Sequence, residues 1–425
     1  MNTRHILLAF AAFLSALQFP ASAKVVEPIQ TIAGDVTYYN SPYGYLEEMV
    51  PSPAYRIETR KFNVSDLEMP EVKVAIICGN APNYEVGYPF PKEYNIPEYV
   101  ELDGEIYPTG GIGRCFANSS VESVGIPDGV MSIEAEAFLD AGELKKLTLP
   151  ASLRSIGCDA FKGTASLGEI YMRSVIPPVC EIKENGKLRT IGLENNGEEI
   201  KSDTPFEGFT GIVYVPKGSE WLYSQHPVFK KLRRLPYQPE FSTPSGVDPA
   251  VTGMFTLGYS GTFSLTVTGG SKLPMRMSIP SEIKSTDYAL GVRMDLNYKN
   301  FPNYIVTSIT NSAFQNYAEA TALTLPQFVE FIGSRSFMNF GTIKSIVIPN
   351  SVRYIGSLAF ANNLKLEKVA LNFYDDDDFK VLCAPDAFEG ISEDAVLYVD
   401  RNTKAIDLTQ APWNKFKEVR DITEY

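Results

Sequence analysis

Histidine, the side chain most often used in acid–base catalysis, is nearly absent from this chain of 425 residues. The two histidines are His5 and His226. The metalloprotease motif H-E-x-x-H needs two histidines four positions apart, so the sequence excludes it. In a second copy of the segment that contains His226, described below, the matching residue is Ala411. We therefore expect His226 to be structural, and we expect no catalytic residue.

The five cysteines are spaced too widely for a metal or redox motif. They are Cys78, Cys115, Cys158, Cys180 and Cys383. The closest two, Cys158 and Cys180, are 22 positions apart, so no C-x-x-C pattern occurs. We expect buried, unpaired thiols. A single disulfide stays open as an alternative, because spacing alone does not predict one.

Acidic side chains supply the remaining candidates for chemistry. The run Asp375, Asp376, Asp377 and Asp378 could bind Ca²⁺ through its oxygen atoms, but the glycine and distal glutamate of an EF-hand are missing. We expect a solvated acidic turn, with weak calcium binding as the alternative. Among 51 acidic residues, a carboxylate pair for glycoside hydrolysis remains compatible with the sequence. The motif G-x-S-x-G and the P-loop do not occur, and we expect no cofactor and no metal.

The net charge excludes one class of partner. The chain has 38 basic and 51 acidic side chains, a formal charge of −13 and a pI near 4.9. Nucleic-acid binding depends on a basic surface that pairs with phosphates. We therefore expect no nucleic-acid partner.

The N-terminus has the pattern of a secretory signal peptide. Arg4 and His5 precede an apolar run over residues 6–19, and Ala21-Ser22-Ala23 supplies a cleavage site of the A-x-A type. The run is shorter than a membrane-spanning helix, and no later segment is apolar enough to span. We expect cleavage before Lys24, which is not the cysteine that lipidation would need. The protein is then secreted, periplasmic or on the cell surface.

A repeat of 23 residues runs through two parts of the chain. In the first part Phe116, Phe138 and Phe161 are 22 and 23 positions apart, and Leu149-Pro150 follows Ile126-Pro127 by 23. In the second part, three matching residues are 23 positions apart: Phe314, Phe337 and Phe360. The alternation L-x-L predicts a short strand with one face turned inward, and proline ends it because it lacks an amide hydrogen. One turn cannot bury its apolar face alone, so we expect stacked turns, parallel strand ladders and a phenylalanine column.

Residues 144–161 read L-K-K-L-T-L-P-x-x-L-x-x-I-G-x-x-A-F. This pattern resembles the BspA-like leucine-rich repeat, a short bacterial type, and the resemblance covers residues 108–235 and 305–425. It implies an exported or surface-displayed protein, and some relatives act as adhesins towards host extracellular proteins. Two positions after the phenylalanine this family often has cysteine. Here those positions hold turn-forming residues, namely Asn118, Asp140, Gly163, Asn316, Asn339 and Asn362.

The chain reads as two copies of one plan. Each repeat block ends in a similar segment, and we interpret the residues around His226 and Trp413 as short caps over the last turn. Strands are predicted before each block, and a mobile surface insertion is expected at 181–204. The expected fold is mainly β, with short helices and two leucine-rich-repeat solenoid arrays. The predicted parts are 1–23, the signal peptide; 24–107, a β-rich region; 108–235, the first array and cap; 236–304, a linker and second β-rich segment; and 305–425, the second array and cap. The strands predicted before the blocks are 71–78, 99–107, 262–268 and 288–296.

The candidate binding surface is the outward face of the array strands, where side chains alternate with the inward Leu, Ile and Val. Its candidate ligand-binding residues are Ser123, Lys146, Thr148, Glu169, Tyr171, Ser345 and Lys368. Ala370 is also expected to point outward. An ordinary solvated sheet face is the plainer interpretation. We expect a monomeric, non-enzymatic protein that binds an extracellular or host protein, or a glycan. A spacer in a surface assembly and a carboxylate-based glycan hydrolase remain the alternatives.

Overall fold

The computed structural model describes most of the chain beyond residue 26. The described residues are 27–31, 37–40, 54–61, 71–78, 90–102, 105–201, 204–242, 247, 249–261, 264–284, 303–372, 381–400, 403 and 405–425. Four sequence-based predictions lie outside them: the signal peptide, the start at Lys24, the strand at 288–296 and the run Asp375, Asp376, Asp377 and Asp378.

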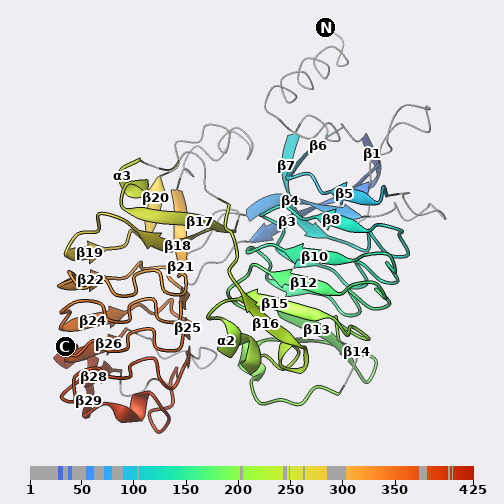
Figure 1. The fold of residues 1–425 in the computed structure, drawn as a ribbon. Coiled ribbons are helices and arrows are strands. Elements are labelled where there is room, and N and C mark those ends of the chain that lie inside the picture. The colour runs from blue at the N-terminus through green and yellow to red at the C-terminus, as the bar shows by residue number, and fades with distance from the viewer. Residues whose placement is uncertain are drawn as a thin grey trace.

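The first half of the chain forms stacked turns, and each turn gives one strand to each of two sheets (Figure 1). One sheet has the order β16 (Arg234–Tyr237), β15 (Ile212–Pro216), β12 (Glu169–Met172), β10 (Lys146–Leu149), β8 (Ser123–Gly125) and β5 (Glu93–Asn95). The other has the order β1 (Glu27–Thr31), β2 (Thr37–Asn40), β3 (Ala54–Lys61), β4 (Glu71–Cys78), β7 (Glu105–Ile112), β9 (Ser132–Ile133), β11 (Ser155–Ile156), β13 (Val179–Glu184) and β14 (Lys187–Ile191), with β6 (Tyr99–Leu102) beside β7.

The second half repeats this arrangement (Figure 1, yellow to red). One sheet has the order β17 (Phe255–Gly261), β18 (Ser264–Gly270), β21 (Asn303–Ile309), β23 (Phe331–Ile332), β25 (Tyr354–Ile355) and β27 (Leu382–Cys383), with β20 (Glu282–Lys284) beside β21. Opposite lie β19 (Arg276–Ser278) with β22 (Ala322–Thr324), and β24 (Ser345–Ile348), β26 (Lys368–Leu371), β28 (Val396–Val399) and β29 (Glu418–Asp421). The predicted mainly β fold with parallel strand ladders is confirmed.

The strand register follows the 23-residue repeat. Lys146 pairs with Glu169, and Ser155 pairs with Ser132, each across 23 positions in a parallel ladder. In β10 the exposed side chains alternate with buried ones, as the L-x-L pattern predicts. The strand ends at Leu149 because the next residue, Pro150, has no amide hydrogen to donate to the ladder.

A column of phenylalanine rings fills the interior of each array. In the first array Phe116, Phe138, Phe161 and Phe206 stack with centroid distances of 5.0, 5.6 and 5.4 Å. In the second array Phe314, Phe337, Phe360 and Phe388 stack at 5.6, 5.4 and 5.2 Å. The predicted columns are confirmed, and they explain why an aromatic residue returns once in each turn.

The turn after each column phenylalanine needs a left-handed residue. The residue two positions after it has a positive φ in all eight turns: Asn118, Asp140, Gly163, Gly208, Asn316, Asn339, Asn362 and Gly390. Asparagine, aspartate and glycine tolerate this conformation better than other residues. The replacement of the family's usual cysteine at these positions therefore agrees with the local backbone.

The segment 181–204, expected to be a mobile insertion, forms strands and a short helix over about half of its length. Strands β13 and β14 pair as an antiparallel hairpin, and a short 3₁₀ helix, η1 (Leu193–Asn195), follows. The side chains of Ile182, Ile191 and Ile200 are buried in the first array. These apolar residues, spread among polar ones, hold the hairpin against the core and let Phe206 continue the column.

The predicted strand at 71–78 matches β4, and the one at 262–268 overlaps β18. The stretch 99–107 contains the hairpin of β6 and β7. Three predicted boundaries fall inside strands: 107/108 lies in β7, 235/236 in β16 and 304/305 in β21. In particular, the first array continues through Tyr237, and the Pro-rich segment belongs partly to its last strand.

Short helices cover the last phenylalanine of each column. In the first array α2 (Glu220–Gln225) leads to η2 (Phe229–Lys231), and the Phe229 ring packs 5.4 Å from Phe206. In the second array Trp413, in η4 (Trp413–Lys415), lies 5.8 Å from Phe388. That these helices act as caps remains a prediction. The other helices among the described residues are α3 (Pro249–Thr252) and η5 (Ile422–Glu424).

The two arrays contact each other through a small apolar cluster and hydrogen bonds. Leu193 and Leu222 of the first half pack with Phe331 of the second, and α2 lies beside the second array in Figure 1. The Ser334 hydroxyl donates to the Gly218 carbonyl at 2.6 Å. No helix in the described part of the chain is long and apolar enough to cross a membrane.

The phenylalanine column yields a stability prediction. Phe337 is fully buried between Phe314 and Phe360, so Phe337→Ala should lower the free energy of unfolding by about 3–5 kcal/mol through lost burial and a cavity. Leu364→Ala is the control, because the Leu364 side chain is 71% exposed and should change stability by about 0.5 kcal/mol or less. Urea denaturation measures both. A loss below about 1 kcal/mol for Phe337→Ala would contradict the column.

Candidate functional site

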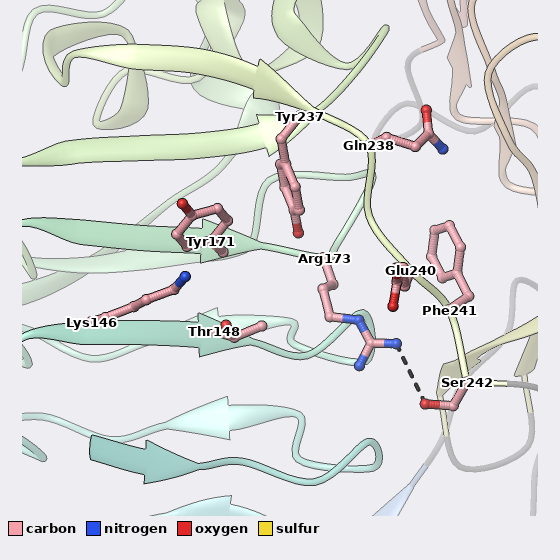
Figure 2. A pocket seen from close by; sticks show the side chains of 9 residues that line it. All are labelled: Lys146, Thr148, Tyr171, Arg173, Tyr237, Gln238, Glu240, Phe241 and Ser242. Carbon is pink, nitrogen blue, oxygen red and sulfur yellow. Dashed lines mark hydrogen bonds between the residues drawn. The ribbon is translucent and has the colours of Figure 1, made fainter.

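A groove lies on the outward strand face of the first array, with a cavity volume of about 680 Å³ (Figure 2). Strands β10 and β12 line one side with Lys146, Thr148, Tyr171 and Arg173. The end of β16 and the segment after it line the other side with Tyr237, Gln238, Glu240, Phe241 and Ser242. The groove therefore forms where the chain leaves the first array and passes back over its strand face.

The parallel register explains why these side chains meet. Thr148 pairs with Tyr171 across β10 and β12, and Tyr171 pairs with Tyr214 across β12 and β15. Equivalent outward positions thus form a row across neighbouring strands. The inward neighbours Leu147 and Ile170 pair with each other and are buried in the core, which holds the outward row in place on the strand face.

Tyr171 is held between two groups on opposite sides. The Tyr214 ring stacks on it at 4.3 Å with an interplanar angle of 9°, and the Lys146 Nζ lies 4.1 Å from its centroid. The Tyr171 hydroxyl donates to Glu169 Oε2 at 3.2 Å, and the Tyr214 hydroxyl donates to Oε1 at 3.4 Å. Desolvation and then the hydrogen bond to Glu169 raise the pKa of Tyr171 to about 12. The Tyr171 ring therefore has one defined orientation, and its hydroxyl stays protonated at neutral pH.

Tyr237 forms the corner of the groove. Its ring meets Tyr171 edge-on, with centroids 5.2 Å apart and an interplanar angle of 86°. Its hydroxyl donates to the carbonyl oxygen of Met172 at 2.9 Å, and burial raises its pKa. Tyr237 thereby attaches the segment 238–242, called the exit segment below, to the end of β12.

Arg173 anchors the far wall through Asp128. Its Nη1 lies 2.9 Å from Asp128 Oδ1, and the Ser242 hydroxyl donates to Asp128 Oδ2 at 2.5 Å. A longer contact of 3.5 Å joins Arg173 Nη2 to Ser242 Oγ (Figure 2). The Ser242 carbonyl accepts from the amide of Tyr259 at 3.0 Å, so the wall is also attached to β17 of the second half. The charge of Arg173 is thus already paired within the protein.

The predicted site residues divide into three groups. Lys146, Thr148 and Tyr171 line the groove, and Glu169 lies beside it as the acceptor for the two tyrosine hydroxyls. Ser123 is exposed next to Lys146 in the ladder but is not part of the lining. Their role in binding remains a prediction.

Ser345 and Lys368 are exposed neighbours on β24 and β26, in the separate sheet of the second array. The Lys368 Nζ lies 5.7 Å from the Tyr398 ring and 5.8 Å from the Tyr425 ring. Ala370, expected to point outward, is fully buried. It pairs with the large side chain Tyr398, and a methyl group beside such a neighbour does not reach the solvent.

Six lining residues were not among the predicted site residues, and five of them form the second wall. The sixth, Arg173 on the first side, is two positions after Tyr171, so strand alternation alone could have identified it. Tyr237 and the residues 238–242 lay in a segment interpreted as a linker. Their return over the strand face depends on contacts such as Ser242 with Asp128, which are 114 positions apart. No local pattern indicates such a contact.

His226 lies away from the groove, in the segment between α2 and η2. Its side chain is fully buried, and its Nδ1 accepts from the amides of Val228 at 3.2 Å and Phe229 at 3.5 Å. The ring also packs edge-on against Phe229 at 5.1 Å. Desolvation lowers the pKa of His226 to about 4, so the side chain is neutral at neutral pH. These contacts are those of a structural residue.

Other reactive groups are also in the interior. All five cysteines are free thiols; four are buried and Cys383 is half-buried. Burial raises the pKa of the Cys78 thiol to about 12, which disfavours the nucleophilic thiolate. Within the described ranges, no group of three or more His, Cys, Asp and Glu side chains is placed to hold a metal ion.

The comparisons with known proteins identify the repeat. Residues 113–220 and 276–375 match the family model described as BspA type leucine rich repeat region, in six copies. No curated protein matches the chain.

Three solved structures show a weaker similarity. A leucine rich cell surface protein from Faecalibacterium prausnitzii is 14% identical, with 90% of this chain and 95% of that chain covered and a TM-score of 0.23. A leucine-rich repeat protein from Bacteroides ovatus is 15% identical, with 88% and 76% covered and a TM-score of 0.23. The pneumococcal vaccine antigen PcpA is 14% identical, with 87% and 96% covered and a TM-score of 0.20. Scores this low carry no conclusion about function.

The buried His226 predicts a pH-dependent loss of stability. Its pKa falls from 6.5 in the unfolded chain to about 4 in the folded protein, so below pH 6.5 the unfolded state binds the proton more readily. At about 1.36 kcal/mol per pKa unit, this costs the folded state about 2.5 kcal/mol by pH 4.5 and nothing above pH 7. His226→Gln should therefore lose less stability than wild type between pH 7 and pH 4.5 in urea denaturation. Parallel losses in the two proteins would contradict the assignment.

Proposed function

Because the chain belongs to the BspA-type leucine-rich repeat family, we propose that it is a non-enzymatic binding protein that recognises a partner outside the cytoplasm. The groove on the first array is the proposed recognition site. The partner is an extracellular protein or a glycan, and adhesion is the role that the family resemblance favours.

The observation that carries this proposal is the groove with its fixed aromatic side chains. Tyr171 and Tyr237 are held by hydrogen bonds to Glu169 and to the Met172 carbonyl. Side chains that are already ordered lose little conformational entropy when a ligand binds, which favours affinity. A merely solvated sheet face would not need such bracing.

The composition of the groove supports binding rather than catalysis. Glycoside hydrolysis normally requires two carboxyl groups that flank one bond. Among the described residues that line the groove, Glu240 is the one carboxylate, and Glu169 beside it accepts from two tyrosine hydroxyls. His226 is buried elsewhere. The groove therefore offers no acid–base pair for a hydrolase.

The location outside the cytoplasm rests on the sequence. The signal-peptide pattern of residues 1–23 supports export, and the acidic net charge of −13 suits a soluble exported protein. Secretion, the periplasm and the cell surface are all compatible with this pattern.

An array of glycans and host extracellular proteins, probed with the purified protein, tests the proposal. We expect a ligand whose binding is weakened at least about tenfold by the double variant Lys146→Ala, Tyr171→Ala, because both side chains line the groove. The matched control is Ser345→Ala, Lys368→Ala, which removes exposed side chains from the second array and should bind as wild type does.

Thermal melts establish that both double variants fold. Binding that is unchanged by the first variant and lost in the second would move the site to the second array. No binding to any member of either class would favour the spacer alternative.

A further inference from the structure

We infer that the groove binds an uncharged, hydroxyl-rich ligand, namely a neutral oligosaccharide, and not an acidic glycan or a peptide. This inference rests on the proposed function and names the ligand class of the same site. It follows from the charges, the free polar groups and the aromatic rings of the lining.

The charges of the lining leave no cation available for an anionic ligand. The Arg173 guanidinium is paired with Asp128 at 2.9 Å, and both side chains are mostly buried. The Lys146 ammonium lies over the Tyr171 ring and 3.9 Å from Glu169 Oε2. Glu240 adds an exposed carboxylate to the groove. An acidic glycan would therefore meet an unpaired negative charge, in a protein that is itself acidic.

The free polar groups suit hydroxyls. Among the described residues, no hydrogen bond engages the side chains of Thr148, Gln238 or Glu240, and all three are exposed. The Glu240 carboxylate accepts, and the Thr148 hydroxyl and the Gln238 amide both donate and accept. A sugar hydroxyl both donates and accepts, so a row of hydroxyls can pair with all three groups.

Aromatic rings provide the apolar part of the lining. Figure 2 shows Tyr171, Tyr237 and Phe241 around the groove, and Phe241 is half-buried against Gly258. The faces of Tyr171 are covered by Tyr214 and Lys146, so Tyr237 and Phe241 are the rings open to a ligand. A sugar ring has a face of C–H groups that can pack on these two rings while its hydroxyls point to the polar groups. A tightly bound peptide would instead need a desolvated apolar pocket for an anchoring side chain. This open groove, with four polar side chains, does not offer one.

The groove has a suitable size for a short oligosaccharide. Its volume of about 680 Å³ lies within the roughly 300–1,000 Å³ of small-molecule sites. Lys146 lies at one end and Ser242 at the other in Figure 2, so an extended ligand would run along β10 towards the segment 238–242.

The test uses isothermal titration calorimetry with the purified protein and two sets of oligosaccharides. One set contains uncharged hexose and N-acetylhexosamine chains, and the other contains chains of the same length that carry uronate or sulfate. We expect binding to members of the first set, with a Kd that changes less than about twofold between 50 and 300 mM NaCl, because no charge pair forms.

Two groove variants and one control variant locate the site. Phe241→Ala should weaken binding at least about tenfold. The control, Tyr425→Ala, removes an exposed ring from the second array and should leave binding unchanged. Thr148→Arg fills the groove from an exposed strand position and should abolish binding even if Phe241→Ala disturbs the exit segment.

Four results would overturn the inference. A preference for the acidic set would leave the proposed function intact but exclude a neutral sugar. So would a protein ligand whose binding is abolished by Thr148→Arg. Neutral oligosaccharides that bind equally to wild type and both groove variants would exclude this groove. The absence of any glycan or protein ligand would remove the proposed function as well.

Discussion

The stacked phenylalanine columns are the constraint on which the rest of the structure depends. Each turn buries one ring between its neighbours, at centroid distances of 5.0–5.6 Å in the two arrays. A ring displaced from this column would open a cavity and lose stacking with two neighbours. The strands must therefore repeat at the same interval, which places side chains 23 positions apart side by side in successive turns.

The outward surface inherits this regular spacing. Thr148, Tyr171 and Tyr214 come from three successive strands and form one row, because the ladders keep those strands in register. The groove needs one further element, which is the exit segment fixed by Tyr237 at one end and by Ser242 at the other. Since Ser242 also bonds to β17, the groove wall connects the two arrays. The proposed binding site is thus built from a repetitive scaffold and a single irregular segment.

Much of the fold could be predicted from the sequence, because its determinants are local and repeated. The spacing of the phenylalanines, the prolines after the strands and the asparagine turns each depend on residues within one or two turns. The outward direction of Lys146, Thr148 and Tyr171 followed from the same alternation. The hairpin at 181–204 was missed because its few apolar residues lie among many polar ones.

The groove itself could not be predicted in full. Its second wall depends on the path of residues 238–242, and that path is fixed by pairs such as Ser242 with Asp128, which are 114 positions apart. The Pro-rich composition around Tyr237 indicates a boundary equally well. Only the folded arrangement distinguishes a free linker from a segment that lies over the strand face.

The central claim is that this groove is the ligand site, and a crystal structure with a bound neutral oligosaccharide tests it most directly. Our account predicts sugar rings in contact with Tyr237 and Phe241, with hydroxyls near Glu240 and Gln238. A ligand bound instead to the strand face of the second array, around Lys368, would contradict it.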